Sequence, residues 1–527
     1  MIGDCAEAAF HREQRASVTG TTANRIALVG LLAFAAVLRL WVAHFQPNII
    51  WPDEIFQVVE PAHRLVYGNG LIAWEYVVGM RSWIFPGVIA CVLWLGSLFG
   101  SDPAFKLIPV QVFMVLASLV PVAVGYRWGE RLDGIRGGLV VGGFLAVWVD
   151  LLYLASHPLS DVISGDVLMI ALYAALPLTT QPGPRRLMLA GALFGLTFVL
   201  RMQLGPALFV AAAFACRRNL QAWGALAAGG AIIVLASGIL DWVTLGTPFQ
   251  SIWLNFWLNV GKGVSHDFGS APAAFFFGLP LFLWGPASVI IVTQLVIGAR
   301  RFPALIAIVL TIFLVQSLFL HKEWRFIFPA LPPLITLCGI AAIEEIKDIR
   351  RFLGSRLSSS WPLVAAMLGI WCLISLLTAI RPIYLPEWTR RRELIQSFEL
   401  AARQPSLCGI GLINIVWPAI PGSAALPGNT PIYAGRSIGG QHETASYNVA
   451  VSNVIAVLPP GYRRLNCYQG TWENNGQLPR TACVWVRDGA CTPGTAAQPE
   501  PNWPPYFTNA HGRPRQDRIQ PYLRPGR

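Results

Sequence analysis

The chain has 527 residues and a formal net charge of +12, yet only 13% of its residues are charged and 54% are hydrophobic. Together with a mean hydropathy of +0.53, this composition excludes a soluble globular protein and predicts a polytopic membrane protein. The apolar stretches are continuous, which favours helices over a barrel. The positive charge is no nucleic-acid signal, because it divides between short connections and an Arg-rich end.

In chain order, the polar and basic residues 1–25 are predicted to be a cytoplasmic segment ahead of a retained first helix. Five later connections collect Lys and Arg, and they share the cytoplasmic side only if residues 82–99 do not cross the membrane. We therefore expect a first outer loop at 46–104 with juxtamembrane helices. About eleven transmembrane helices are predicted, at 26–45, 105–126, 138–155, 162–178, 187–200, 204–216, 222–243, 274–297, 303–320, 326–343 and 362–380. The count falls if the short pair 187–200 and 204–216 forms a broken hairpin.

Two adjacent carboxylates, Asp53 and Glu54, stand where the first apolar run gives way to polar sequence. Acidic residues beside a bilayer are costly unless they lie in water or a polar cavity, so the pair predicts a functional site, with a solvated turn as the alternative. The other polar clusters fall on the same outer side in the predicted topology. This indicates an extracytoplasmic active site, unless outer loops simply collect polar residues.

After residue 380 the composition shifts to Pro, Gly, Asn and Thr without another apolar span. We expect a small soluble α/β domain at 381–497 and a disordered Pro- and Arg-rich tail at 498–527. The domain holds Cys408, Cys467, Cys483 and Cys491, which in an oxidising compartment can form up to two disulfides of undetermined pairing. The lack of an Asn-X-Ser/Thr site favours a bacterial inner membrane, with the site facing the periplasm, over an ER membrane.

The polar clusters carry recognisable blocks. The first outer loop contains Trp51-Pro52-Asp53-Glu54-x-Phe56-Gln57, then Glu60-Pro61-Ala62-His63-Arg64, Trp74-Glu75-Tyr76 and Arg81-Ser82, and later blocks are Asp241, Asn255-Phe256 and His321-Lys322-Glu323-x-Arg325-Phe326. Between residues 26 and 343 the chain resembles glycosyltransferase family 22 of the GT-C superfamily, the polyprenyl- or dolichyl-phosphate-mannose-dependent mannosyltransferases of GPI-anchor and N-glycan assembly. Trp51 stands where that family has His, so no role for that His carries over.

The resemblance implies an all-α GT-C membrane domain at 26–380 that transfers a hexose, here mannose, from a polyprenyl-phosphate donor to a lipid-linked or glycan acceptor. In an inverting displacement Asp53 would be the general base, and Glu54 would hold the acceptor or tune Asp53. The donor phosphate would be bound by His321, Lys322, Arg325 and Arg201. The remaining candidates, expected to bind substrate, are Glu60, Trp74, Glu75, Arg81, His157, Asp161, His266 and Glu323.

Two alternatives stay open. One is a GT-C transferase that uses a polyprenyl-phosphate pentose or aminosugar, and the other is a lipid or sugar transporter. A transporter would bury polar residues through the bilayer depth in repeated halves, whereas this chain gathers them at one face. No cofactor is expected, because the histidines lack metal-ligand spacing and a divalent cation is not favoured. The expected partners are the donor, the acceptor and membrane lipids, without nucleic acid.

Overall fold

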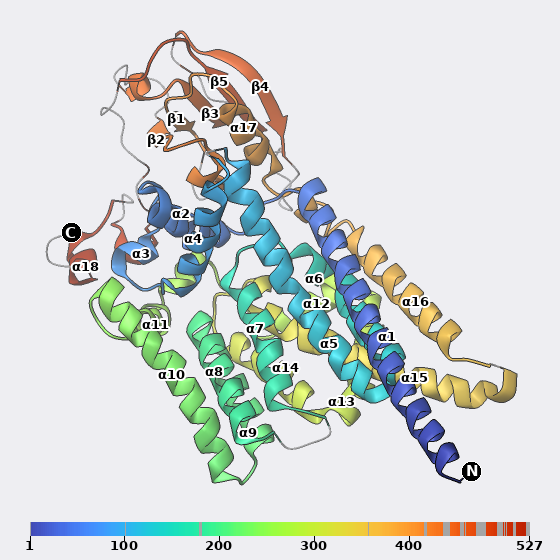
Figure 1. Ribbon diagram of the computed structural model, residues 1–527. Coiled ribbons are helices and arrows are strands. Elements are labelled where there is room, and N and C mark those ends of the chain that lie inside the picture. The colour runs from blue at the N-terminus through green and yellow to red at the C-terminus, as the bar shows by residue number, and fades with distance from the viewer. Residues whose placement is uncertain are drawn as a thin grey trace.

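The computed structural model describes residues 2–100, 102–178, 182–356, 358–415, 419–435, 443–453, 458, 460–470, 481–492, 499, 501, 503–509 and 513–522. A helical bundle fills the lower part of Figure 1, and a small sheet domain lies above one end of it. The N-terminus lies at the opposite end of the bundle from the sheet. The chain is therefore an all-α membrane-type domain that carries a small α/β domain, as its composition predicts.

The bundle consists of helices that are apolar for most of their length. They are α1 (Ile2–Phe45), α5 (Ala104–Val147), α6 (Val149–Tyr153), α7 (Ser160–Ala175), α8 (Pro184–Leu200), α9 (Gly205–Cys216), α10 (Leu220–Leu245), α11 (Gln250–Phe256), α12 (Phe275–Trp284), α13 (Ala287–Arg301), α14 (Pro303–Leu318), α15 (Leu331–Leu353) and α16 (Trp361–Ala379). Small residues let them approach closely. A Cβ on Gly191 of α8 would lie 1.9 Å from the carbonyl oxygen of Leu226 in α10.

Helix length only partly resolves the number of membrane crossings. Within the described residues, five helices are long and apolar enough to span a bilayer, or six if α12 and α13, which are bent by 120°, form one span. Those five lie at Thr22–Phe45, Ala104–Val147, Leu220–Leu245, Trp324–Leu353 and Trp361–Ala379. Shorter apolar helices contribute the rest of the bundle, so the multi-pass architecture is clear and the count of eleven stays a prediction.

The longest bundle helix, α5, is a helical hairpin. Its course breaks at Asp133 (φ −152°, ψ 33°) and Gly134 (φ 61°, ψ −147°), where only glycine tolerates the positive φ easily. The two arms touch, because a Cβ on Gly129 would lie 2.1 Å from the carbonyl oxygen of Gly137. The arms correspond to the crossings predicted at 105–126 and 138–155.

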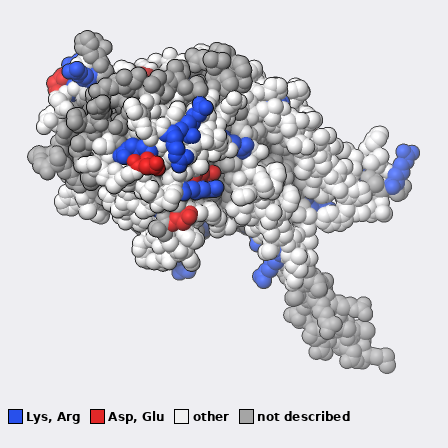
Figure 2. All heavy atoms as spheres, turned by 90° about the horizontal axis from the view of Figure 1, so that it is seen from above, with Lys and Arg blue, Asp and Glu red and all other residues white. Residues whose placement is uncertain are grey.

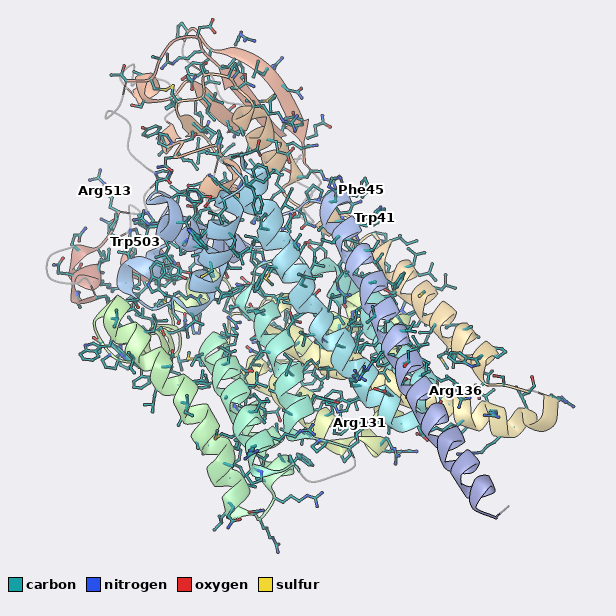
Figure 3. All side chains as sticks on the ribbon, viewed as in Figure 1. Trp41, Phe45, Arg131, Arg136, Trp503 and Arg513 are labelled. Atoms are coloured by element: carbon teal, nitrogen blue, oxygen red, sulfur yellow. A yellow bond between two sulfur atoms is a disulfide. The ribbon has the colours of Figure 1, made fainter. Side chains whose placement is uncertain are left out.

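The ends of the bundle differ in charge. Arg131 and Arg136, beside the α5 turn, lie near the end of the bundle that is remote from Trp41 and Phe45 at the close of α1 (Figure 3). The sheet domain sits at the Phe45 end. Seen from that end, most of the described surface is uncharged, and several of the visible cations lie beside acidic residues (Figure 2). Basic residues at the turns remote from the Phe45 end are the pattern from which sidedness was predicted.

The first outer loop folds into short helices: a π-helix at Glu54–Val59, α2 (Glu60–Tyr67), α3 (Trp74–Val78) and α4 (Ile84–Ser97). Helix α4 has 14 residues, about 21 Å at 1.5 Å per residue, which is less than a bilayer core of about 30 Å. It packs against α2 and the start of α5. Helix α4 is therefore too short for a straight crossing of the bilayer core, and the juxtamembrane position expected for residues 82–99 stays a prediction.

The C-terminal domain is a five-stranded sheet with the strand order β2-β1-β3-β5-β4. Strand β1 is parallel to β2 and β3, whereas β5 is antiparallel to β3 and β4, and α17 packs on the sheet. The elements are α17 (Arg392–Ala402), β1 (Ile410–Ile413), β2 (Ile432–Gly435), β3 (Val449–Asn453), β4 (Arg463–Gln469) and β5 (Thr481–Val486). Mixed strand directions with one helix give the α/β character expected from the sequence.

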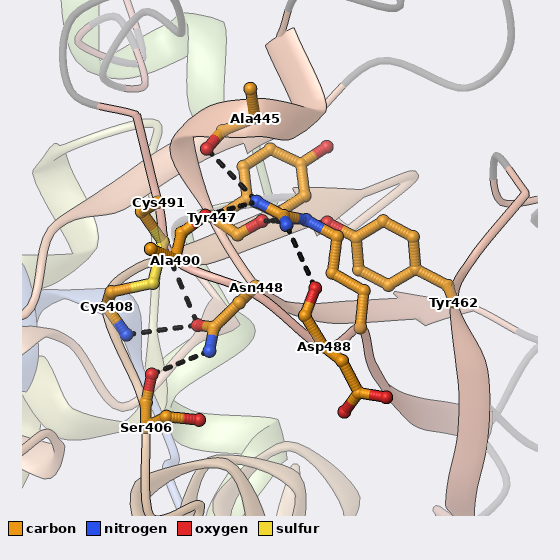
Figure 4. Close-up of a disulfide and its surroundings, with 10 residues drawn as sticks. Ser406, Cys408, Ala445, Tyr447, Asn448, Tyr462, Asp488, Ala490 and Cys491 are labelled. Atoms are coloured by element: carbon orange, nitrogen blue, oxygen red, sulfur yellow. Dashed lines mark hydrogen bonds between the residues drawn. A yellow bond between two sulfur atoms is a disulfide. The ribbon is translucent and has the colours of Figure 1, made fainter.

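Two disulfides cross-link this domain. The sequence left their pairing open, and the structure pairs Cys408 with Cys491 and Cys467 with Cys483. The second joins the neighbouring strands β4 and β5. Around the first, the side chain of Asn448 accepts a hydrogen bond from the Cys408 backbone N–H at 3.0 Å and donates to the Ser406 carbonyl at 2.7 Å (Figure 4). The segment before β1 and the segment after β5 are thereby joined to each other, and Asn448 links the first of them to the start of the central strand β3.

The sheet domain docks on the first outer loop through buried polar contacts. Glu60, fully buried, accepts hydrogen bonds from the Ser423 backbone N–H and, at 2.7 Å, from the Leu71 N–H. Lys106 of α5, also fully buried, donates to the Leu426 and Gly428 carbonyls at 2.8 and 3.2 Å. These contacts connect two parts of the chain that are more than 300 residues apart.

The C-terminal tail differs from its prediction where the structure describes it. Phe507 is fully buried against Trp74 of α3, with ring centroids 5.5 Å apart, and Ile519 of α18 (Gln516–Ile519) is 2% exposed in the same cluster. This part of the tail is ordered, although its composition predicts disorder. Residues 498, 500, 502, 510–512 and 523–527 of the predicted tail lie outside the described residues.

Candidate active site

A cavity of about 680 Å³ opens between the first outer loop, the α8–α9 turn, α11 and the segment after α14. One part of its wall is apolar, with Phe198, Ile252, Phe256, Val315 and Phe319. The ionisable side chains of the wall are Asp53, Glu75, Arg81, Arg201, His321, Glu323 and Arg325. Residues from four distant parts of the sequence thus meet in one cavity beside an apolar surface.

Asp53 stands at the N-terminal end of the π-helix Glu54–Val59, directly after Pro52. Its Oδ1 accepts a hydrogen bond from the Gln57 side-chain amide at 2.8 Å, and its Oδ2 forms an ion pair with the Arg325 guanidinium. The side chain is 24% exposed. Asp53 is therefore a held carboxylate with access to the cavity, which is the geometry that a general base requires.

Arg325 is the centre of the charge network. Its Nε donates to Glu323 Oε2 at 2.5 Å, its Nη1 to Asp161 Oδ2 at 3.3 Å, and its Nη2 contacts Asp53. The side chain is 5% exposed, so the charge is stabilised by these carboxylates and not by water. Every nitrogen of this guanidinium is used by a protein acceptor.

Asp161 lies at the first turn of α7 and links the two buried arginines. It is fully buried, contacts Arg201 with one oxygen and accepts from Arg325 with the other. Asp161 is not among the residues that line the cavity. It positions the arginines from behind and does not contact the space where substrate would bind.

Glu54, predicted to hold the acceptor or tune Asp53, points away from the cavity. It is 2% exposed, accepts from the Ile50 and Trp51 backbone N–H groups at 2.6 and 3.3 Å, and lies 2.5 Å from His157 Nδ1. His157, predicted to bind substrate, is itself buried. The pair fixes the turn that carries Asp53, so both residues act in the structure as supports of the loop.

Glu75, Arg81 and Gln57 form a second group on the wall. The Gln57 amide nitrogen donates to Glu75 Oε1 at 2.9 Å as well as to Asp53, and Arg81 Nη2 lies 4.0 Å from Glu75. Burial raises the pKa of Glu75, and the Arg81 charge opposes this shift. Gln57 belongs to the first motif of the outer loop, but the sequence does not show its role, because an amide carries no charge that would mark it.

The residues of the late outer motif, which is the block at 321–326, lie in different surroundings in the structure. His321 and Glu323 line the cavity and lie 3.2 Å apart. Burial opposes ionisation of Glu323, but Arg325 and His321 outweigh burial and hold its pKa at about 2. Lys322 instead donates to the Phe319 carbonyl and, at 3.0 Å, to the Ala271 carbonyl, and it is not among the cavity-lining residues.

The remaining predicted residues are placed as follows. Trp74 lines the cavity and stacks on Phe268, with ring centroids 6.5 Å apart. Glu60 serves the domain contact described above, outside the cavity, where burial raises its pKa to about 7. His266 is exposed and is not among the residues that line the cavity, whereas the nearby Ser265 and Phe268 are.

Side-chain amides also line the wall, and none of them was predicted to have a role of its own: Gln57, Gln203, Asn255, Asn259 and Gln316. In the described part of the chain, no three His, Cys, Asp or Glu side chains gather in a way that could hold a metal ion. The chemistry available at the cavity is thus that of carboxylates, guanidiniums, one imidazole and amides.

The architecture is that of a multi-pass helical membrane protein with a cavity beside its first outer loop. The fold is similar to the crystal structure of ArnT from Cupriavidus metallidurans bound to undecaprenyl phosphate, with a TM-score of 0.53 and 15% identity, covering 86% of this chain and 97% of that one. At this identity the likeness concerns the fold alone.

The particular family follows from the sequence. Residues 31–395 match the model of the Alg9-like mannosyltransferase family, and the chain belongs to that family. Similar relatives include GPI mannosyltransferase 3 of Yarrowia lipolytica, 26% identical over 61% of this chain, and GPI alpha-1,2-mannosyltransferase 3 of Homo sapiens, 26% identical over 59%. The chain spans 64% and 56% of the lengths of these two relatives.

Proposed function

We propose that the protein is an integral-membrane mannosyltransferase that transfers mannose from a polyprenyl-phosphate donor to a hydroxyl group of a lipid-linked or glycan acceptor. The observation that carries the proposal is the cavity in which Asp53 stands beside Arg325 and Arg201. Family membership supports the choice of mannose as the sugar. The proposed site faces away from the cytoplasm, because the basic α5 turn lies near the opposite end of the bundle.

The proposed reaction is a single inverting displacement at the anomeric carbon of the sugar. An acceptor hydroxyl attacks this carbon while Asp53 takes its proton, and the bond between the anomeric carbon and the phosphate oxygen breaks. The bonding electrons leave with the phosphate, so a lipid phosphodiester becomes a lipid monophosphate. Guanidiniums stabilise the added negative charge, and no protonated acid is needed for this leaving group.

The contacts of Asp53 suit this role. The ion pair with Arg325 and the hydrogen bond from Gln57 hold the two oxygens of the Asp53 carboxylate. The same contacts hold the side chain in one orientation, with 24% of it exposed toward the cavity. A positioned base that needs no large rearrangement is the kind of pre-organisation that lowers a reaction barrier.

The apolar part of the wall suits a lipid donor. Phe198, Phe256, Phe319 and Trp253 line it, and Trp253 and the nearby Trp257 are 47% and 45% exposed. Aromatic side chains of this kind are enriched where a protein meets the membrane interface. We infer that the isoprenoid chain enters along this side while the sugar phosphate reaches the charged part.

The proposed setting is a bacterial inner membrane, with the cavity facing the periplasm. Two disulfides in the sheet domain support a compartment that is oxidising on that side. The donor, the acceptor and membrane lipids are the proposed partners.

The test is a donor panel. Purified protein in nanodiscs is incubated with polyprenyl-phosphate mannose, pentose or aminosugar and a lipid extract of the source cell, and the anomeric configuration of the product is determined. We expect transfer from the mannose donor with inversion. Transfer from the pentose or aminosugar donor alone would replace mannose with the alternative sugar. Lipid movement across the bilayer without transfer from any donor would favour the transporter alternative.

A further inference from the structure

A smaller pocket of about 70 Å³ adjoins the main cavity, between the segment after α3, the α8–α9 turn and α11. Its polar lining includes Arg81, Ser82, Ser160, Arg201, Gln203, Ser251 and Asn255. No Asp or Glu is among the described residues that line it, whereas the main cavity has three. The pocket therefore combines two guanidiniums with hydroxyl and amide groups and has a positive lining.

The late outer motif offers less capacity for a phosphate than its charges suggest. All three nitrogens of Arg325 contact carboxylates, so only one N–H on Nη1 and one on Nη2 are left for a ligand, and three negative partners already balance its charge. Lys322 donates to two backbone carbonyls and does not line the cavity. Among the described residues Arg325 has three carboxylate partners, whereas Arg201 has one, Asp161, so Arg325 is the more fully neutralised of the two.

Arg81 has fewer protein partners than Arg325 and so has more N–H donors available for a ligand. Its only ion contact among the described residues is the one to Glu75 at 4.0 Å, and its buried Nε has no hydrogen-bond partner there. A buried donor without a partner is destabilising, and a bound acceptor removes this cost. Arg201, which lines the same pocket, contacts Asp161 through Nη2.

The pocket lies beside the proposed base. Gln57 lines both the pocket and the main cavity, and its amide donates to Asp53 at 2.8 Å. A phosphate in the pocket would thus stand one side chain away from Asp53. This arrangement leaves the main cavity for the sugar and the acceptor, as an inverting displacement requires.

We propose that Arg81 and Arg201 in this side pocket bind the phosphate group of the donor lipid, and that Arg325 positions the surrounding carboxylates. This inference rests on the proposed function and assigns its phosphate site. Guanidiniums bind phosphate oxygens in pairs, and hydroxyl and amide donors complete the shell. The chemistry recognised is a phosphate monoester or diester, whether it belongs to a lipid or is free.

The experiment measures binding of polyprenyl monophosphate, and separately of inorganic phosphate, to the full chain in nanodiscs. We expect Arg81→Ala to weaken polyprenyl monophosphate binding about 10- to 100-fold, in line with the loss of charge-assisted hydrogen bonds. Arg81→Lys should bind with intermediate affinity, because it keeps the charge and loses the paired geometry. The matched control is Lys262→Ala, which removes an exposed cation on the same side that lines neither space and should leave binding unchanged.

The outcomes separate this inference from the proposed function. If the wild type transfers mannose while Arg81→Ala and Arg81→Lys bind lipid phosphate as tightly as the wild type, the pocket assignment is overturned and the function stands. If inorganic phosphate shows the same dependence on Arg81, the pocket recognises phosphate itself. If Lys262→Ala weakens binding as much as Arg81→Ala, the effect is general surface charge and the assignment is overturned. A wild type that neither binds lipid phosphate nor transfers sugar would refute the proposed function.

Discussion

Replacing Gln57 with Leu removes the side chain that joins two carboxylates of the cavity wall. The Gln57 amide nitrogen lies 2.8 Å from Asp53 Oδ1 and 2.9 Å from Glu75 Oε1. Because both partners are acceptors, only the NH₂ end of the amide can face them. The Tyr76 hydroxyl holds the same residue by donating to its backbone carbonyl at 2.7 Å. Leucine has nearly the same size, so the substitution removes the donor and preserves the packing.

The size of the effect follows from these two bonds. A hydrogen bond to a charged group contributes about 1.5–3 kcal/mol, and each 1.36 kcal/mol in the barrier is tenfold in rate. Loss of the bond that holds Asp53 should therefore lower kcat about 10- to 150-fold. The KM for the donor should change little, because the donor phosphate is assigned to Arg81 and Arg201. Burial already raises the pKa of Glu75, and loss of the Gln57 donor raises it further.

Single-turnover transfer at several pH values tests this reasoning, with Gln57→Glu as the informative companion. A glutamate at position 57 can donate to Asp53 only when it is protonated, so Gln57→Glu should regain activity as the pH falls. The wild type should show no such recovery. A Gln57→Leu enzyme with kcat within about twofold of the wild type, or a Gln57→Glu enzyme with the wild-type pH profile, would refute the positioning role.

Two further predictions concern the parts that support the site. Burial raises the pKa of Glu60 from 4.5 to about 7, so the folded protein keeps a proton that the unfolded chain has lost. Stability should therefore fall as the pH rises from about 4.5 to about 7, and Glu60→Gln should flatten this dependence in thermal melting. An equal slope in both proteins would contradict the assignment. Phe507→Ala removes a fully buried ring worth about 3–5 kcal/mol in a packed core, and it should expose the C-terminal segment to proteolysis. Because Phe507 packs on Trp74, the KM should rise as well, and unchanged proteolysis would show that the segment is held by other contacts.

Much of the membrane domain follows from the sequence because its signals are local. Basic residues between apolar runs predicted that residues 82–99 do not cross, and α4 is a 14-residue helix in the outer loop. The carboxylates at the end of the first helix predicted a site, and Asp53 lines the cavity there. Arg325, 272 residues away, was found through its own motif, and the structure brings the two side chains into contact.

Other roles depend on partners that no local pattern specifies. Glu60 and Glu75 are both loop carboxylates in the sequence, yet one meets Ser423 of the sheet domain and the other lines the cavity. Spacing alone could not show that the Lys322 ammonium donates to two backbone carbonyls. Nor could it show that the buried Nε of Arg81 has no hydrogen-bond partner among the described residues. The disulfide pairing was likewise undetermined, because any two of four cysteines can be joined until strand register is known.

The tail shows how composition can mislead. A segment rich in Pro and Arg with few apolar residues cannot build a core of its own, which is why disorder was expected. Here Phe507, Tyr506 and Ile519 add to a core that the outer loop and α11 already provide. The Tyr506 backbone N–H also donates to Asp267 at 2.8 Å. A few anchoring side chains therefore suffice when the partner surface is preformed.

The central claim is that Asp53 removes the proton of the attacking hydroxyl while a lipid phosphate leaves. The most direct test compares mannose transfer by the wild type and Asp53→Asn in the same nanodiscs, with polyprenyl monophosphate binding measured in parallel. We expect a loss of about 100- to 10,000-fold in turnover with lipid phosphate binding unchanged, since general bases contribute rate factors of this size. Turnover by Asp53→Asn close to that of the wild type would contradict it.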